Sequence, residues 1–146
     1  MTKVCIFGAG AIGGYVGARL AMKGEADVSL VARGPHLAAM QANGLTLKQA
    51  GETHVVHPQV TDDPKSLGPQ DYIILTLKAH GLAGVIEALQ PLIGKDTAIL
   101  FAQNGIPWWY FHGVGGPYEG IRLESVDPGG VIWDRIGPER ALGTVV

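Results

Sequence analysis

Short, unbroken apolar runs recur along this 146-residue chain, and polar or glycine-rich stretches separate them. An apolar run of about four to eight residues without polar alternation is typical of a strand that is covered on both faces. The chain contains such runs at Val4–Phe7, Asp27–Ala32, Asp71–Thr76, Asp96–Ala102 and Ala141–Val146. We therefore predict that these segments are strands of one mostly parallel sheet.

Helical patterns fill several of the gaps between these strands. Tyr15–Lys23 and Pro35–Asn43 are each followed by a glycine, and the second has its proline in the first turn, where proline is tolerated. A third segment, Gly81–Ile93, carries apolar residues at helical spacing, namely Leu82, Val85, Ile86, Leu89 and Leu92. The alternation predicts an α/β fold of the Rossmann type, a doubly wound sheet with helices on both faces, formed by residues 1–146 as one domain.

Four further segments have weaker patterns. Leu45–Lys48 and Thr53–His57 read as two short strands around a turn, and Val131–Asp134 reads as another strand. Asp62–Gln70 is polar and contains two prolines and a glycine, so we expect a loop or a broken short helix.

The loop Pro107–His112 is unusually aromatic, since it holds Trp108, Trp109, Tyr110 and Phe111. Two adjacent tryptophans in a loop can form a ligand wall or a contact with another domain. They can equally form a hydrophobic plug over the edge of the sheet. The sequence leaves both interpretations open.

The composition supports a folded protein with a substantial core. Hydrophobic residues make up 47% of the chain and charged residues 16%, which argues against disorder. A net charge of −2 gives no reason to expect a nucleic acid or an anionic membrane as partner. The chain has no apolar run of about 18 residues, and Met1 leads directly into a strand instead of a signal peptide.

The single cysteine, Cys5, permits no internal disulfide, so we expect a cytoplasmic protein. Cys5 lies inside the first predicted strand, where a small buried core residue is expected in preference to a nucleophile. His54 and His57 are three residues apart on a predicted strand and point to opposite faces, so we expect surface residues and no metal site.

The strongest chemical signal is the glycine motif between the first strand and the first helix. Gly8 lets the chain turn sharply out of the strand, and Gly10 leaves room for a pyrophosphate to approach the backbone. Gly13 lets the helix pack closely on the strand. The free amides at the start of the helix favour an anion. The motif therefore predicts a dinucleotide phosphate site, although a plain strand-to-helix turn would share these glycines.

Arg33 follows the second strand, where a dinucleotide site reads the adenine ribose. An acid at this place binds the ribose 2′-hydroxyl of NAD, whereas an arginine accommodates the 2′-phosphate of NADP. The guanidinium can donate two charge-assisted hydrogen bonds to a phosphate at once. Arg33 predicts NADP(H) as cofactor, the alternative being a solvated loop residue.

Lys78 and Asn104 each come shortly after a predicted strand. Ligands of open α/β sheets bind at the carboxyl ends of the strands, so we expect both residues on the same rim as Gly8–Gly13 and Arg33. A cation and an amide there can line a cofactor and substrate site. The alternatives are a solvated lysine and a turn asparagine. For His80, at the start of a predicted helix, we expect a capping or surface role.

Four motifs in this order, FGAGAIGG, VARG, LTLKAH and AQNG, resemble the N-terminal domain of the ketopantoate reductases (2-dehydropantoate 2-reductases). The resemblance covers essentially the whole chain. It implies an oxidoreductase that uses NADPH to reduce a 2-keto acid, 2-dehydropantoate, to pantoate on the route to pantothenate and coenzyme A. Arg33 would bind the 2′-phosphate, and Lys78 and Asn104 would line the cofactor and substrate site. The pyrophosphate would lie on the glycine turn, Gly8, Ala9, Gly10, Ala11, Ile12 and Gly13.

The resemblance also implies parts that lie outside this chain. Family members continue into a helical C-terminal domain, which supplies the principal catalytic lysine, so we assign no catalytic residue before Val146. That domain and a small 2-keto acid are the expected partners, and a homodimer is left open. Three alternatives stay open: a stand-alone module that binds NADP(H) without catalysis, a reductase of another keto acid, and a dehydrogenase of a sugar nucleotide or polyol phosphate.

Overall fold

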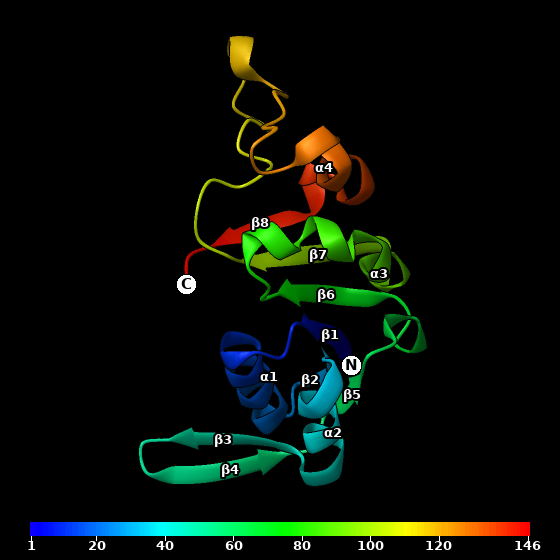
Figure 1. The fold of residues 1–146 in the computed structure, drawn as a ribbon, viewed down its shortest axis with the longest axis vertical. Coiled ribbons are helices and arrows are strands. Elements are labelled where there is room, and N and C mark those ends of the chain that lie inside the picture. Colours follow the sequence, from blue (N-terminus) through cyan, green and yellow to red (C-terminus); the bar gives the residue numbers. More distant parts are fainter.

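The computed structural model describes residues 1–146 and contains a six-stranded parallel sheet and a separate two-stranded hairpin (Figure 1). The sheet order is β5-β2-β1-β6-β7-β8, and every pair of neighbours is parallel. The sheet strands are β1 (Thr2–Phe7), β2 (Ala26–Val31), β5 (Gln59–Thr61), β6 (Gln70–Leu75), β7 (Ile93–Ala102) and β8 (Ala141–Thr144). Along the chain, β2 and β5 are added on one side of β1, and β6, β7 and β8 are then added on the other side. This order confirms the predicted Rossmann-type, doubly wound sheet.

Both faces of the sheet are buried, which explains the unbroken apolar runs. In β1, Val4 and Ile6 belong to one core cluster, whereas Cys5 and Phe7 belong to the other. Successive side chains of a strand point to opposite faces, so every position of such a strand must be apolar. Cys5 is fully buried, and burial raises the pKa of its thiol to about 12, against the opposing effect of the neighbouring Ser29 hydroxyl. Its prediction as a core residue is confirmed.

Two helices lie on each side of the sheet. The first core cluster includes residues of α1 (Ala11–Lys23) and α2 (Gly34–Asn43), and the second includes residues of α3 (Ile86–Leu89) and α4 (Val131–Ile136). Gly24 ends α1 in a left-handed conformation, with φ of 69°, and Gly44 follows α2 as its cap. The boundaries of α2 agree with its prediction to within one residue.

The strands β3 (Leu45–Gln49) and β4 (Glu52–Val56) form an antiparallel hairpin outside the main sheet, as the two predicted short strands suggested. Leu45 and Leu47 join the core cluster that contains α1. In Figure 1 the hairpin lies at one end of the molecule, and the segment after β7 projects from the other end. The polar segment from Asp62 contains only one short 3₁₀ turn, Pro64–Ser66, as expected.

The helix predicted over Gly81–Ile93 is broken into short turns, so this prediction is partly wrong. Only Ile86–Leu89 is α-helical, and 3₁₀ turns precede and follow it. Gly81, Gly84 and Pro91 all disfavour a continuous helix. The burial was nevertheless predicted correctly, because Leu82, Ile86, Leu89 and Leu92 are all buried. Strand β7 begins at Ile93, three residues before its predicted start.

The strand predicted over Val131–Asp134 is wrong, since these residues begin α4. Asp127 is 1% exposed, and its carboxylate accepts hydrogen bonds from the amides of Ile132 (2.8 Å) and Trp133 (2.9 Å). Ile132 and Ile136, one helical turn apart, are buried against the second core cluster. Capping and burial therefore override the preference of valine and isoleucine for strands.

Replacing Asp127 with alanine should lower the free energy of unfolding by about 1–3 kcal/mol, because two amides would lose their acceptors in a largely buried place. Urea unfolding followed by tryptophan fluorescence measures this change. Asp134→Ala, within α4 itself, is the matched control. It removes an exposed carboxylate paired with Arg122 and should cost less than about 1 kcal/mol. Equal losses in the two variants would contradict the capping role of Asp127.

Candidate functional site

The glycine turn between β1 and α1 is shaped by contacts that leave no room for side chains. Gly8 has φ of +107°, and a Cβ there would lie 2.8 Å from Leu77 Cδ2. A Cβ on Gly13 would lie 2.1 Å from the Gly8 carbonyl oxygen and 2.6 Å from Thr76 Oγ1. Such distances are shorter than any normal contact, so α1 reaches this position against β1 only because residue 13 is glycine.

Gly10 differs from these two glycines because nothing lies within 4 Å of a Cβ built on it. It is exposed and stands at the N-terminal cap of α1, where no side chain accepts a hydrogen bond from the helix. The first turn of α1 also carries no acidic residue. The amides at this helix end are therefore free to bind an anion from the open side.

A cleft of about 570 Å³ runs along the carboxyl ends of β1, β2 and β6. Its lining includes Gly8, Ala9 and Gly10 of the glycine turn, together with Arg33 and Lys78. The structure thus brings together three places that are far apart in sequence. Arg33 and Lys78 are both exposed, and neither forms an ion pair with an acidic side chain. The cleft therefore offers two unpaired cations beside a helix N-terminus.

Not every residue of the predicted glycine site lines this cleft. Ala11 lines a smaller hollow between α1 and the β3–β4 hairpin, and Gly13 is buried beneath the turn. Ile12 is 43% exposed on the first turn of α1. Of the predicted glycine site, only Gly8, Ala9 and Gly10 line this cleft.

Sequence reasoning missed two side chains that hold the glycine turn in place. His36 Nε2 lies 2.6 Å from the Ala9 carbonyl oxygen, so this nitrogen carries the proton and donates. The Thr76 hydroxyl donates a hydrogen bond to the Gly8 carbonyl oxygen. His36 lies three residues after Arg33 and Thr76 two before Lys78. This proximity to predicted site residues was the only signal in the sequence for either of them.

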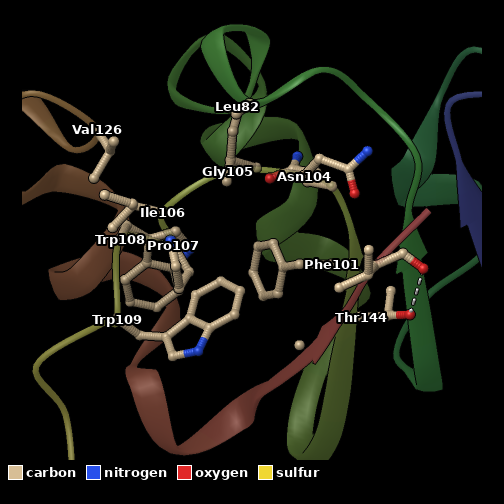
Figure 2. A pocket seen from close by; sticks show the side chains of 14 residues that line it. Leu82, Phe101, Asn104, Gly105, Ile106, Pro107, Trp108, Trp109, Val126 and Thr144 are labelled. Carbon is tan, nitrogen blue, oxygen red and sulfur yellow. Dashed lines mark hydrogen bonds between the residues drawn. The ribbon is translucent and has the colours of Figure 1, made fainter.

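Asn104 lies outside this cleft. Its amide nitrogen donates to the Val146 carbonyl at 2.8 Å, and its oxygen accepts from the Val146 amide at 2.9 Å. It lines an adjoining cleft of about 300 Å³ at the carboxyl ends of β7 and β8 (Figure 2). The structure therefore places Asn104 next to the cleft that holds Arg33 and Lys78, with its amide group engaged by the backbone.

Comparison with known proteins identifies the family to which the chain belongs. The model of the family described as "Ketopantoate reductase PanE/ApbA" matches residues 4–107, about two thirds of the chain. The chain belongs to the ketopantoate reductase family. This confirms the resemblance carried by the four sequence motifs.

Two relatives of the family match nearly the full chain. A 2-dehydropantoate 2-reductase of Mesorhizobium japonicum is 56% identical over 99% of the chain and 44% of its own length. A crystal structure from Ralstonia solanacearum MolK2, assigned to the ketopantoate reductases, has 46% identity and a TM-score of 0.92. That match covers 100% of this chain and 45% of the other. The chain thus spans less than half the length of these ketopantoate reductases.

A more distant structure shares the fold of this ketopantoate reductase domain. It is the ternary structure of D-mandelate dehydrogenase with NADH and anilino(oxo)acetate, with a TM-score of 0.74 and 23% identity. The match covers 99% of this chain and 40% of that one. At this identity the likeness concerns the fold alone.

In the aromatic loop of this ketopantoate reductase domain, the two tryptophans lie in different environments. Trp108 is 3% exposed and packs edge-on against Phe101 and Trp133, with ring centroids 5.7 and 6.0 Å apart, so it is a plug of the core. Trp109 is only partly buried and lines the cleft next to Asn104, with its ring 4.7 Å from that of Phe101 (Figure 2).

The remaining candidates lie apart from both clefts. His80 is exposed in a 3₁₀ turn, and His54 Nε2 lies 3.1 Å from the Glu52 carboxylate on the hairpin. No group of three or more histidine, cysteine, aspartate or glutamate side chains is arranged to hold a metal ion. None of the helices has the length and apolar character needed to cross a membrane.

Alanine should destabilise the protein much more at Gly13 than at Gly10. Gly13→Ala forces a Cβ against the Gly8 carbonyl and should lower the free energy of unfolding by about 2 kcal/mol or more. Gly10→Ala enters open space and should cost less than about 1 kcal/mol. Urea unfolding of both variants measures the difference. A Gly13→Ala variant as stable as the parent would contradict the close packing described here.

Proposed function

We propose that this chain is the NADPH-binding part of a reductase that converts a 2-keto acid to the 2-hydroxy acid. The substrate named for its relatives, 2-dehydropantoate, would be reduced to pantoate on the route to pantothenate and coenzyme A. The observation that carries the proposal is the cleft that joins the glycine turn to Arg33 and Lys78. Family membership supports the same reaction class.

The chemistry of the cleft fits a phosphorylated dinucleotide. The open space above Gly10 and the free amides at the start of α1 suit a pyrophosphate. Thr76 and His36 would hold that turn in a fixed shape through their hydrogen bonds to the Gly8 and Ala9 carbonyls. A rigid turn loses little conformational entropy when a ligand binds, so these two contacts would favour affinity.

Arg33 favours NADPH over NADH. Its side chain lines the cleft directly after β2, forms no ion pair, and can donate two hydrogen bonds to a 2′-phosphate. No acid follows β2 to bind a 2′-hydroxyl. The acid that does line the cleft, Asp62, follows β5 instead. The site thus lacks the feature by which dinucleotide folds select NAD.

Lys78 would act next to the reacting atoms. When bound, NADPH would supply the hydride that reduces the keto carbon. The unpaired ammonium group of Lys78 would attract the substrate carboxylate and stabilise the negative charge that develops on the keto oxygen. Asn104 would first have to release the Val146 backbone before its amide could bind the cofactor or the substrate.

The rest of the enzyme would lie outside this chain. Because the chain spans less than half of its relatives, a helical C-terminal domain would complete the substrate site. That domain would supply the lysine that protonates the keto oxygen. On this account the isolated chain binds cofactor weakly and has little or no turnover.

Replacing Arg33 with alanine should weaken NADPH binding about tenfold or more and leave NADH binding nearly unchanged, because only NADPH carries the 2′-phosphate. Isothermal titration of parent and variant with both cofactors measures the two ratios. Arg19→Ala is the matched control, since this arginine lies on the far part of α1 and bonds to Gln49. An equal loss for both cofactors would contradict the assignment of Arg33.

A further inference from the structure

The cleft beside Asn104 has an unusual lining for a site next to a phosphate-binding cleft. None of its lining residues carries a charge. The walls are built mainly from apolar and aromatic side chains, Leu82, Phe101, Ile106, Trp108, Trp109 and Val126 (Figure 2). We propose that this cleft holds the substituent of the 2-keto acid substrate, and that the substituent it binds best is aromatic. This inference rests on the proposed function.

The position of the cleft fits one end of a keto acid. Lys78 lines the cofactor cleft, and the next residue, Ala79, lines the aromatic cleft. A keto acid with its carboxylate near Lys78 can therefore extend its substituent into the adjoining cleft. The reverse orientation would bury a carboxylate among uncharged, mostly apolar side chains, which is costly.

The size and the walls of the cleft favour a flat ring. Its volume is about 300 Å³, and an apolar cavity of about 150 Å³ already holds benzene. The rings of Phe101 and Trp109 lie 4.7 Å apart at 46°, and Trp108 stands edge-on to both. Aromatic groups pack well against such tilted and edge-on faces. A methyl substituent would leave most of these walls without contact.

Part of the wall lies outside the segment that the family model matches. The family match ends at Pro107, directly before Trp108 and Trp109. The Mesorhizobium and Ralstonia relatives match the chain through this segment. Together with Phe101 and Ile106, the two tryptophans stand at the carboxyl ends of the strands, where ligands of such sheets bind.

The test follows the indole N–H signals of a ¹⁵N-labelled chain by NMR, in the presence of saturating NADP⁺. The probes are phenylglyoxylate, 2-dehydropantoate and pyruvate. Trp109 lines the cleft and Trp133 does not, so their signals report on the site and on the rest of the molecule. We expect phenylglyoxylate to shift Trp109 with a Kd at least tenfold below that of pyruvate, and also below that of 2-dehydropantoate.

Two variants test the location. Gly143 is exposed on β8, and a Cβ there would lie 3.5 Å from Trp109 Cζ2, so Gly143→Leu places a side chain in the cleft. It should weaken phenylglyoxylate binding about tenfold and leave NADP⁺ binding unchanged. Ile106→Ala, at a position 62% exposed on the rim, should weaken it severalfold without disturbing the fold. Leu142→Ala, on the opposite face of β8, is the control and should change neither affinity.

Three results would overturn the inference. Equal affinities for phenylglyoxylate and pyruvate would show that the cleft has no preference for an aromatic substituent. A shift of Trp109 by NADP⁺ alone, with no further change on adding a keto acid, would assign the cleft to the nicotinamide and leave the proposed function standing. Failure of the folded chain to show even the weak NADP⁺ binding expected of it would overturn the proposed function, and this inference with it.

Discussion

The close approach between the glycine turn and the end of β6 is the contact on which the candidate site depends. At Gly13 the helix α1 comes so near the Gly8 carbonyl that no side chain fits between them. Thr76, directly after β6, donates its hydroxyl to the same carbonyl. One backbone oxygen thus joins β1, α1 and β6. The start of α1 is thereby fixed beside Gly8, Ala9 and Gly10, which line the cleft.

The parallel sheet brings the other residues of the candidate site together. Because all six strands run in one direction, the residues that follow β1, β2 and β6 meet at one rim although they are far apart in sequence. Arg33 and Lys78 lie at this rim, form no ion pair with an acidic side chain, and give the cleft its positive charge. Next to it, β7, β8 and the aromatic loop form a cleft of opposite chemistry, uncharged and largely apolar. A charged cofactor and a partly apolar substrate need such neighbouring environments.

Much of this arrangement could be predicted from the sequence, because the deciding signals are local. Unbroken apolar runs mark strands buried on both faces, and Gly8 and Gly13 mark a turn that few other sequences permit. The errors occur where particular side-chain contacts or strand pairings decide the local structure. Val131–Ile136 becomes a helix because Asp127 caps it, and the three-residue strand β5 exists only through its pairing with β2. The roles of Thr76 and His36 depend on backbone oxygens that only the folded chain brings near.

A crystal structure of the chain with NADP⁺ would give the distances from the cofactor phosphates to the protein, which decide whether this cleft is the dinucleotide site. We expect the pyrophosphate within hydrogen-bond distance of the amides at the start of α1, above Gly10. We expect the 2′-phosphate within about 3 Å of the Arg33 guanidinium. A dinucleotide bound elsewhere, or a 2′-phosphate pointing into solvent away from Arg33, would contradict this assignment.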